Sequence, residues 1–308
     1  MRLDQALVAR GLASSRSVAA RLIASGAVQV DGEQIVRAAH QVAPEAALGV
    51  LESPENRFVS RAGAKLDGLL AARRDIRVHG YWVDLGQGTG GFTACLLVRG
   101  ARRVLGIEVG HAQLHPELRI DPRVRACEGV NARDLHQAVQ PAALDAAWPV
   151  QGADGVVVDL SFISLLQVLE PAAALLATPG CLIALIKPQF ELGADGATGA
   201  CPAGGASGAW RADRAPGACR ADGAGEAGRA ARARSASPLR RGVVRDASVY
   251  PQVLARIVQC LDQLGLHVDP SHDLVESCLP GLEGNREFFV VARKAIPAGG
   301  AGAHRSEL

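Results

Sequence analysis

A glycine-rich segment carries the most specific chemical signal in the sequence. Residues 84–91 read Asp-Leu-Gly-Gln-Gly-Thr-Gly-Gly, between an apolar run typical of a buried strand and a helical pattern. Glycines at such a strand-to-helix turn let the backbone approach a ligand closely. The spacing of Gly86, Gly88 and Gly91 is that of a dinucleotide site, so the loop alone suits either NAD or S-adenosylmethionine.

Two carboxylates bear on this choice. Asp84 stands at the strand end before the first glycine, and Glu108 closes the next predicted strand, where a carboxylate can bind ribose hydroxyls. Glu108 fits either nucleotide, so Asp84 carries the preference for S-adenosylmethionine. The cofactor-binding residues that we expect are Asp84, Gly86, Gly88, Thr89, Gly90, Gly91, Phe92, Glu108 and Asn131. The alternatives are a glycine-rich turn without a ligand and, for Asn131, a helix cap.

A second set of charged residues is dispersed along the chain and comprises Lys65, Asp159, Lys187 and Glu287. Asp159 and Lys187 each lie at the carboxyl end of a predicted strand, the edge at which sheets of this kind bind ligands. A lysine at the end of an apolar strand is costly unless a carboxylate pairs with it, and Asp159 is the natural partner of Lys187. A purely structural ion pair is the equally weighted alternative.

The elements that must position these residues follow an alternating order. From about Val59, apolar runs of strand length alternate with helical patterns, which is typical of a doubly wound α/β sheet with parallel strands. The expected strands are residues 81–85, 104–109, 155–160 and 181–187, with a last strand that contains Val290 and Val291. The expected helices lie near residues 91–99, 165–177 and 246–264.

The first 50 residues predict a smaller α+β unit of helix, helix and hairpin. Leu3 and Leu7 share one helical face, and a second helical pattern, with Ser14 as its cap, ends at Gly26. The hairpin is expected from Val28 and Val30 on one strand, a turn at Asp31-Gly32, and Ile35 and Val36 on the returning strand. Residues 51–58 carry a proline and charges without an apolar period, so we expect a linker.

Composition bounds the remaining classes. The 308 residues suffice for about two domains, and a net charge of +2 with 48% hydrophobic residues excludes both a disordered acidic chain and a polycation. Residues 192–241 hold eight arginines against four acids and no apolar period, so we expect a disordered insert, and residues 295–308 a loose tail. The cysteines and histidines show no metal-ligand spacing, so no metal site is expected.

Location is predicted from hydropathy. The sequence contains no run of 18 or more apolar residues, the length of a membrane span. Its first residues are charged and lack the apolar centre of a signal peptide. We therefore expect a cytoplasmic protein.

Eight motifs occur in an order that resembles a known family. They are VSRAGAKL, DLGQGTGGFT, IEVG, NAR, VVVDLSFISL, IKPQFE, GVVRD and GNREFF. Together they resemble the TlyA family of ribosomal RNA 2′-O-methyltransferases, sometimes labelled haemolysins, whose Rossmann-like catalytic domain is similar to that of the FtsJ group. The first unit, with RLDQAL and SSRSVAARLIASGAVQVDG, resembles the alpha-L RNA-binding domain first seen in a small-subunit ribosomal protein. The resemblance covers nearly the whole chain apart from the insert and the tail.

The resemblance implies a catalytic tetrad of Lys65, Asp159, Lys187 and Glu287 that acts on a ribose 2′-hydroxyl of a ribosomal RNA cytidine. The sulfonium of S-adenosylmethionine already activates the methyl group, so the enzyme must supply orientation and a base for the hydroxyl proton. A lysine serves as a base only where burial or cationic neighbours favour its neutral form, and Lys65 can supply such a neighbour for Lys187. We assign Asp159 to holding the lysine amines in position and Glu287 to a supporting contact.

The chain departs from the family pattern in the cofactor loop. The family usually carries Ala-Ser where this chain has Gln87-Gly88, Asp at the position of Ala94, and Asp at that of Glu108. We therefore expect the backbone of the loop to hold the cofactor as in the family, while side-chain contacts to its methionine part differ. The family also passes from KPQFE to GVVRD through a short segment, where this chain has the insert.

Four arginines of the first unit are the expected phosphate contacts: Arg2, Arg10, Arg16 and Arg21. This assignment depends on the resemblance, because on charge alone a solvated helix face is the commoner interpretation. Few aromatic residues are available for base stacking, so we expect this unit to bind RNA shape and phosphates.

The sequence as a whole predicts an S-adenosylmethionine-dependent ribosomal RNA methyltransferase. The main alternative is a ribosome-binding or assembly factor that keeps the fold without catalysis, against which the intact tetrad argues. A membrane-active haemolysin would need an amphipathic or spanning element, and we find none in the sequence.

Overall fold

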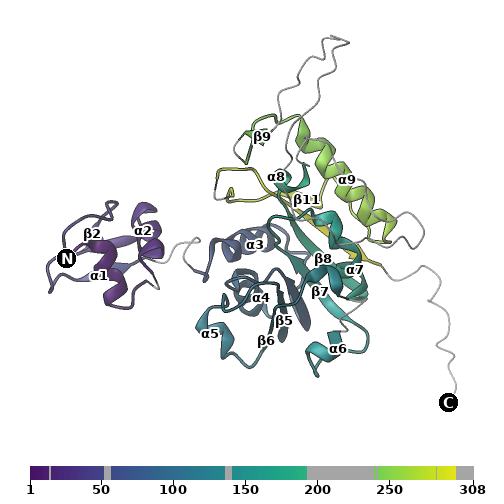
Figure 1. Ribbon diagram of the computed structural model, residues 1–308, viewed down its shortest axis with the longest axis horizontal. Helices are drawn as coiled ribbons and strands as arrows, with labels where there is room; N and C mark the ends of the chain where they lie inside the picture. Colours follow the sequence, from purple (N-terminus) through teal and green to yellow (C-terminus); the bar gives the residue numbers. More distant parts are fainter. Residues whose placement is uncertain are drawn as a thin grey trace, which may run out of the picture.

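The computed structural model describes residues 1–13, 15–51, 57–135, 141–192, 239–240, 242–281 and 283–295. Within these ranges the chain forms a small N-terminal unit and a larger α/β unit, as the ribbon in Figure 1 shows. In the described part, no helix combines the length and the apolar character needed to cross a membrane.

The N-terminal unit confirms the two predicted helices and extends the predicted hairpin to three strands. Its elements are α1 (Leu3–Ala9), α2 (Arg16–Ala24), β1 (Val28–Val30), β2 (Glu33–Gln34) and β3 (Leu48–Val50). Strand β3, which the sequence analysis did not predict, pairs with β1 on the edge away from β2. Strand β2 is shorter than expected, and Val36 lies beyond it with 61% of its surface exposed. Ser14 lies outside the described residues, and Ser15 Oγ accepts a hydrogen bond from Val18 N at 3.3 Å.

The expected linker is only partly described. Residues 52–56 lie outside the described ranges. Phe58, which we placed at the end of the linker, is buried instead and packs in the core of the larger unit. Phe58 lies so close to Gly63 that a Cβ at Gly63 would be 2.5 Å from Cβ of Phe58 and 2.6 Å from its Cγ, so the larger unit begins earlier than predicted.

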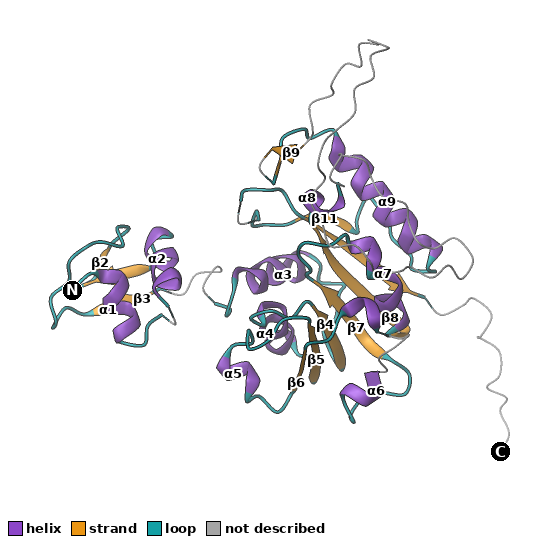
Figure 2. Cartoon of the chain, in the orientation of Figure 1, coloured by secondary structure: helices purple, strands orange, loops and turns teal. Residues whose placement is uncertain are grey.

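The larger unit is built on a seven-stranded sheet with the order β11-β12-β8-β7-β4-β5-β6, drawn in orange in Figure 2. Its strands are β4 (Tyr81–Leu85), β5 (Arg103–Glu108), β6 (Val124–Glu128), β7 (Ala153–Val158), β8 (Leu176–Ile186), β11 (Leu274–Glu276) and β12 (Phe288–Lys294). The pairs between β6, β5, β4, β7 and β8 are parallel, and β12 is antiparallel to both β8 and β11. The doubly wound α/β class is confirmed. The predicted parallel strands form most of the sheet, and the antiparallel pairing of β12 with β8 and β11 at one edge was not predicted from the pattern.

The chain between β11 and β12 explains the reversed strand. A parallel neighbour needs a crossover of a dozen or more residues, usually a helix. Within the described residues from 277 to 287, no helix occurs, so β12 returns beside β11 in the opposite direction. Strands β6 and β11 were not predicted, because both are half-exposed and carry charged residues that break an apolar pattern.

Helices cover both faces of the sheet. They are α3 (Arg61–Ala72), α4 (Gly91–Arg99), α5 (Pro116–Arg119), α6 (Pro141–Leu144), α7 (Leu169–Ala174), α8 (Pro188–Glu191) and α9 (Val249–Gln263), with 3-10 turns η1 (Ala132–Asp134) and η2 (Leu165–Gln167). One core contains apolar residues of α3 and α4, and the other those of α7 and α9. Because both faces are covered, the ends of the strands are left for ligands.

The helix expected over residues 165–177 is broken. Residues 165–167 form η2, α7 begins at Leu169, and residue 176 already belongs to β8. Proline has no N–H to donate and is tolerated only in the first turn of a helix. Pro171 therefore fixes the start of α7 close to Leu169.

Most of the expected insert at residues 192–241 lies outside the described residues. Residues 193–238 and 241 lie outside the described ranges, as do residues 296–308 of the expected tail. Leu192 is buried at 6% exposure, and β9 (Leu239–Arg240) pairs with β10 (Val243–Val244). Both flanks of the stretch are therefore ordered.

Candidate cofactor-binding and catalytic site

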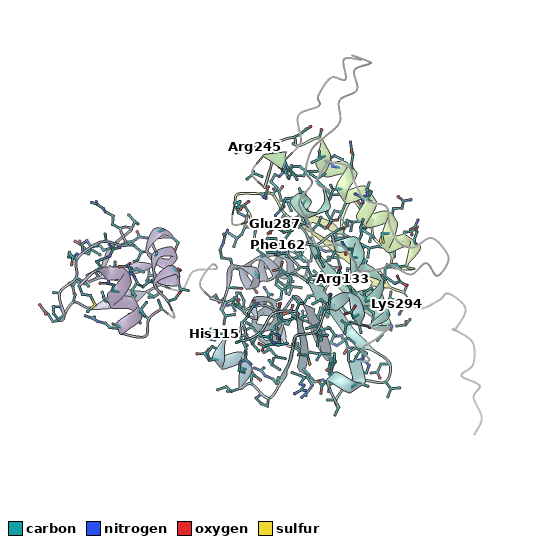
Figure 3. The ribbon with its side chains drawn as sticks, in the orientation of Figure 1. His115, Arg133, Phe162, Arg245, Glu287 and Lys294 are labelled. Atoms are coloured by element: carbon teal, nitrogen blue, oxygen red, sulfur yellow. The ribbon has the colours of Figure 1, made fainter. Side chains whose placement is uncertain are left out.

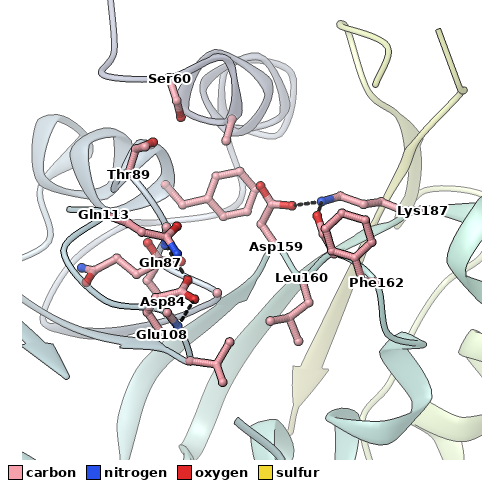
Figure 4. A pocket seen from close by; sticks show the side chains of 18 residues that line it. Ser60, Asp84, Gln87, Thr89, Glu108, Gln113, Asp159, Leu160, Phe162 and Lys187 are labelled. Atoms are coloured by element: carbon pink, nitrogen blue, oxygen red, sulfur yellow. Dashed lines mark hydrogen bonds and ion pairs between the residues drawn. The ribbon is translucent and has the colours of Figure 1, made fainter. Parts of the chain in front are cut away.

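Charged residues from four adjacent strands meet at one edge of the sheet. Asp84 is the penultimate residue of β4 and Glu108 the last of β5, while Asp159 and Lys187 directly follow β7 and β8. Because these four strands are parallel neighbours, their carboxyl ends lie side by side. They surround a pocket of about 480 Å³, in which Asp84 and Glu108 lie at one side and the Asp159–Lys187 pair at the other (Figure 4).

The reversed strand β12 brings Glu287 to the same edge. Phe288 pairs with Ile186 in the ladder between β12 and β8, so Glu287 and Lys187 are the next residues beyond that pair. Lys65 reaches this region from α3. Three members of the expected tetrad thus come from strand ends and the fourth from a helix.

The tetrad consists of two ion pairs. Lys187 Nζ lies 2.6 Å from Asp159 Oδ1 and donates to Ser161 Oγ at 2.9 Å. Asp159 Oδ1 accepts no hydrogen bond of good geometry from the described residues, so its contact with Lys187 is an ion pair. Lys65 Nζ lies 2.5 Å from Glu287 Oε2, and both side chains are buried. The predicted pairing of Asp159 with Lys187 is present, whereas Lys65 is held by Glu287 and not by Asp159.

Only one of these pairs faces the pocket. Asp159 and Lys187 are among its lining residues in the described part of the chain, and Lys65 and Glu287 are not. Burying an unpaired charge costs several kcal/mol of folding free energy. Lys65 and Glu287, which lie behind the wall of the pocket, therefore each need the other as a partner.

The glycine loop has the conformation that the sequence predicts. Gly86 has a φ of +84°, and a Cβ there would lie 2.5 Å from the carbonyl oxygen of Asp159. Any other residue would be strained and would push the loop away from the strand end that carries Asp159. The other expected cofactor residues that line the pocket are Asp84, Gly88, Thr89, Gly91, Phe92 and Glu108.

Two expected cofactor residues do not line the pocket. Gly90 faces away from it, since a Cβ there would meet the side chains of Leu118 and Leu114. Asn131 begins η1, and its side-chain oxygen accepts a hydrogen bond from Arg133 N at 3.1 Å. The structure thus shows for Asn131 the helix cap that the sequence left as the alternative.

Asp84 is a buried carboxyl group on the wall of the pocket. Burial raises the pKa of Asp84 to about 7, the nearby charges of Asp159 and Glu108 add to the rise, and hydrogen bonds from Thr93 oppose it. Asp84 Oδ2 accepts from Thr93 N at 3.0 Å and from Thr93 Oγ1 at 2.7 Å. Asp84 Oδ1 has no hydrogen-bond partner among the described residues. A buried, unpartnered carboxylate oxygen in a pocket fits a ligand that brings a cationic donor.

Glu108 has a structural role in addition to the one expected. Its Oε2 accepts a hydrogen bond from Gly88 N at 2.9 Å, and its Oε1 accepts one from Gly110 N at 2.7 Å. Each carboxylate oxygen has a second lone pair, so Glu108 can also bind ribose hydroxyls. The residue therefore fixes the glycine loop while remaining available to a ligand.

Phe162 is a pocket residue that the sequence analysis missed. Phe162 has a φ of +68° and is 88% exposed, and its ring centroid lies 5.3 Å from that of Phe190. Figure 3 labels Phe162, and the close view in Figure 4 shows its ring beside Lys187 at the pocket. A strained backbone that presents an exposed aromatic ring beside Lys187 is typical of a functional contact. The one signal in the sequence was its place three residues after Asp159, within the motif VVVDLSFISL.

The arginines of the N-terminal unit are largely engaged within it. Arg2 and Arg16 both pair with the buried Asp4, and Arg10 donates to the carbonyl oxygens of residues 44 and 46. The side chain of Arg21 lies outside the described part. A guanidinium has five donors, so Arg2, Arg10 and Arg16 can still bind phosphate.

Comparison with known proteins defines the class to which this fold and site belong. The FtsJ-like methyltransferase family matches residues 58–201, and the S4 domain matches residues 1–48. The chain is 43% identical over 192 residues to the 16S/23S rRNA (cytidine-2'-O)-methyltransferase TlyA of Mycobacterium tuberculosis, covering 62% of this chain and 68% of that protein. It is 34% identical over 191 residues to Hemolysin A of Brachyspira hyodysenteriae, covering 62% of this chain and 75% of that protein.

The fold is similar to that of a solved structure over most of the chain. A hemolysin structure from Streptococcus thermophilus has a TM-score of 0.60 and 28% identity, covering 96% of this chain and 88% of that one. The protein is thus an FtsJ-like methyltransferase with an N-terminal S4 domain. It belongs to the TlyA family, as its motifs indicated. Its methyl donor is S-adenosylmethionine, and the buried Asp84 Oδ1, unpartnered among the described residues, fits the ammonium group of that cofactor.

Proposed function

We propose that the protein methylates the ribose 2′-hydroxyl of a cytidine in ribosomal RNA. The observation that carries this proposal is the Lys187–Asp159 ion pair on the wall of the pocket that Asp84 and Glu108 also line. The name of the Mycobacterium tuberculosis relative supports the substrate and the position of the methyl group.

The reaction requires a hydroxyl to become a nucleophile. Bound S-adenosylmethionine supplies an electrophilic methyl group on a sulfonium, so this chain must orient the hydroxyl and remove its proton. Methyl transfer would form the oxygen–carbon bond and break the carbon–sulfur bond of the donor, which would leave as S-adenosylhomocysteine. The O–H bond breaks in the same step, and Lys187 Nζ takes the proton when its amine is in the neutral form. Asp159, 2.6 Å from that nitrogen, holds the ammonium that results. Lys65 and Glu287 act through the wall as positioning residues, because neither lines the pocket.

The RNA contacts divide between the two units. The S4 domain supplies affinity for structured RNA through its arginines, and the proposal places the protein with ribosomal subunits in the cytoplasm. Phe162 presents an exposed ring beside Lys187, where it can stack on the target base. Stacking there would hold the attached ribose next to the Lys187–Asp159 pair.

Transfer of labelled methyl to purified unmodified ribosomal subunits tests the proposal, followed by mapping of 2′-O-methyl nucleotides. Wild type is compared with Lys187→Ala and with a matched control, Lys294→Ala, which removes a lysine that donates to carbonyl oxygens of residues 173 and 176. Loss of a positioned base lowers the reaction rate about 10²- to 10⁴-fold. Lys187→Ala should therefore transfer almost no labelled methyl, while the control variant remains active. Cofactor binding without label on either subunit or on free RNA would instead support the non-catalytic factor.

A further inference from the structure

Gln87 links the glycine loop to Asp84 through Thr93. Gln87 is 4% exposed, and its Nε2 donates to Thr93 Oγ1 at 3.0 Å. Thr93 Oγ1 in turn donates to Asp84 Oδ2 at 2.7 Å. Because the amide of Gln87 occupies a lone pair of the Thr93 oxygen, the hydroxyl hydrogen is directed at Asp84.

We propose that Gln87 is a positioning residue for cofactor binding. It holds the Thr93 hydroxyl against Asp84 Oδ2, which fixes the carboxylate with its buried Oδ1 unpartnered among the described residues, so that this oxygen can accept from the ligand. This inference rests on the proposed function, since S-adenosylmethionine is the ligand whose ammonium group would meet that oxygen.

Gly106 provides the space in which the Gln87 amide lies. Gly106 pairs with Asp84 in the ladder between β4 and β5. A Cβ at Gly106 would lie 2.0 Å from both Cδ and Nε2 of Gln87 and 2.2 Å from its Oε1. No side-chain carbon fits there without expelling the amide, so Gln87 and Gly106 depend on each other.

This dependence gives a test that does not require methylation activity. The dissociation constant of S-adenosylmethionine is measured by calorimetry for wild type, Gln87→Ala, Gly106→Ala and the double variant, with Gln263→Ala at an exposed helix end as the matched control. A lost internal hydrogen bond corresponds to about a three- to tenfold change. Each single variant should bind about three- to tenfold more weakly, and the double variant no more weakly than Gln87→Ala.

Two further readouts separate positioning from a general loss of structure. Thr93→Val breaks the relay at its next member, so adding Gln87→Ala to it should have no further effect on binding. In Gln87→Ala, the Thr93 hydroxyl is no longer oriented toward Asp84, so its hydrogen bond stabilises the ionised carboxylate less. The pH below which cofactor binding weakens should therefore be higher than in wild type. Asp159 and Glu108, the other carboxylates that face Asp84, are unchanged in that variant, and a purely structural defect would weaken binding equally at every pH.

The outcomes distinguish the inference from the proposed function. Failure of the wild type to bind S-adenosylmethionine would overturn both. Normal binding by wild type together with unchanged binding by Gln87→Ala, or losses that add in the double variant, would overturn the role of Gln87 alone. Thermal unfolding of each variant identifies those that have lost the fold, and Thr93→Val then tests the relay with little change of volume.

Discussion

Lowering the pH from 8 to 6 should weaken the binding of S-adenosylmethionine about tenfold through Asp84 alone. Burial raises the pKa of this carboxyl group to about 7, and its buried Oδ1 has no hydrogen-bond partner among the described residues, so a cationic donor would satisfy it. A cationic ligand binds the ionised form, so binding expels a proton from the group. The ionised fraction falls from about nine-tenths at pH 8 to about one-tenth at pH 6, which corresponds to about 1.4 kcal/mol of binding free energy.

Calorimetry in pairs of buffers with different ionisation enthalpies measures both the dissociation constant and the protons released. About half a proton per ligand should appear at pH 7, and fewer at pH 8. Asp84→Asn should bind weakly without pH dependence, while the exposed Asp134→Asn should behave as wild type. S-adenosylhomocysteine keeps the ammonium group and should show the same dependence. A wild-type dissociation constant that stays constant between pH 6 and 8 would refute this reasoning.

The remaining predictions concern the wall of the pocket, its rim and the N-terminal unit. Glu287→Ala leaves Lys65 buried without a partner and should lower the free energy of unfolding by about 3 to 5 kcal/mol, measured by denaturant titration; the apolar pair Lys65→Met with Glu287→Leu should recover stability but not methylation. Phe162→Ala should keep the cofactor dissociation constant and reduce methylation of subunits about fivefold or more, whereas Phe162→Trp should retain activity; equal loss in both would remove stacking as the cause. Deletion of residues 1–50 should leave cofactor binding intact and weaken methylation of whole subunits, and unchanged methylation would exclude a targeting role. The unliganded protein should lose stability as the pH rises from about 4 to about 7, because the folded pKa of Asp84 lies above its ordinary value of 3.8, and Asp84→Asn should flatten this slope in thermal unfolding.

The residues at the carboxyl ends of parallel strands could be predicted from the sequence. Asp84, Glu108, Asp159 and Lys187 each end or directly follow an apolar run, and the geometry of a doubly wound sheet brings such ends together. The apolar pattern of a strand shows which of its residues are buried and where the strand ends. These four positions could therefore be predicted without information on tertiary contacts.

The contacts between distant elements could not be predicted from residue patterns alone. The pairing of Lys65 with Glu287 depends on the reversed direction of β12, which follows from a connection without a helix and not from the composition of the strand. The position of the Gln87 amide depends on the free space above Gly106, which belongs to the neighbouring strand β5. The exposure of Phe162 depends on a positive φ at a residue type for which it is unusual.

The position of β12 late in the chain also determines when the site can assemble during synthesis. Lys65 and Glu287 are 222 residues apart in sequence, and burial of the lysine is unfavourable until its carboxylate arrives. A ribosome that has made α3 and the first strands must still synthesise β11 and the start of β12 before this wall of the pocket can close. Contacts of such long range form late and slow folding. The pocket wall is therefore completed after translation has passed Glu287, and a nascent chain that stops short of it carries an unpaired lysine where the finished enzyme carries an ion pair.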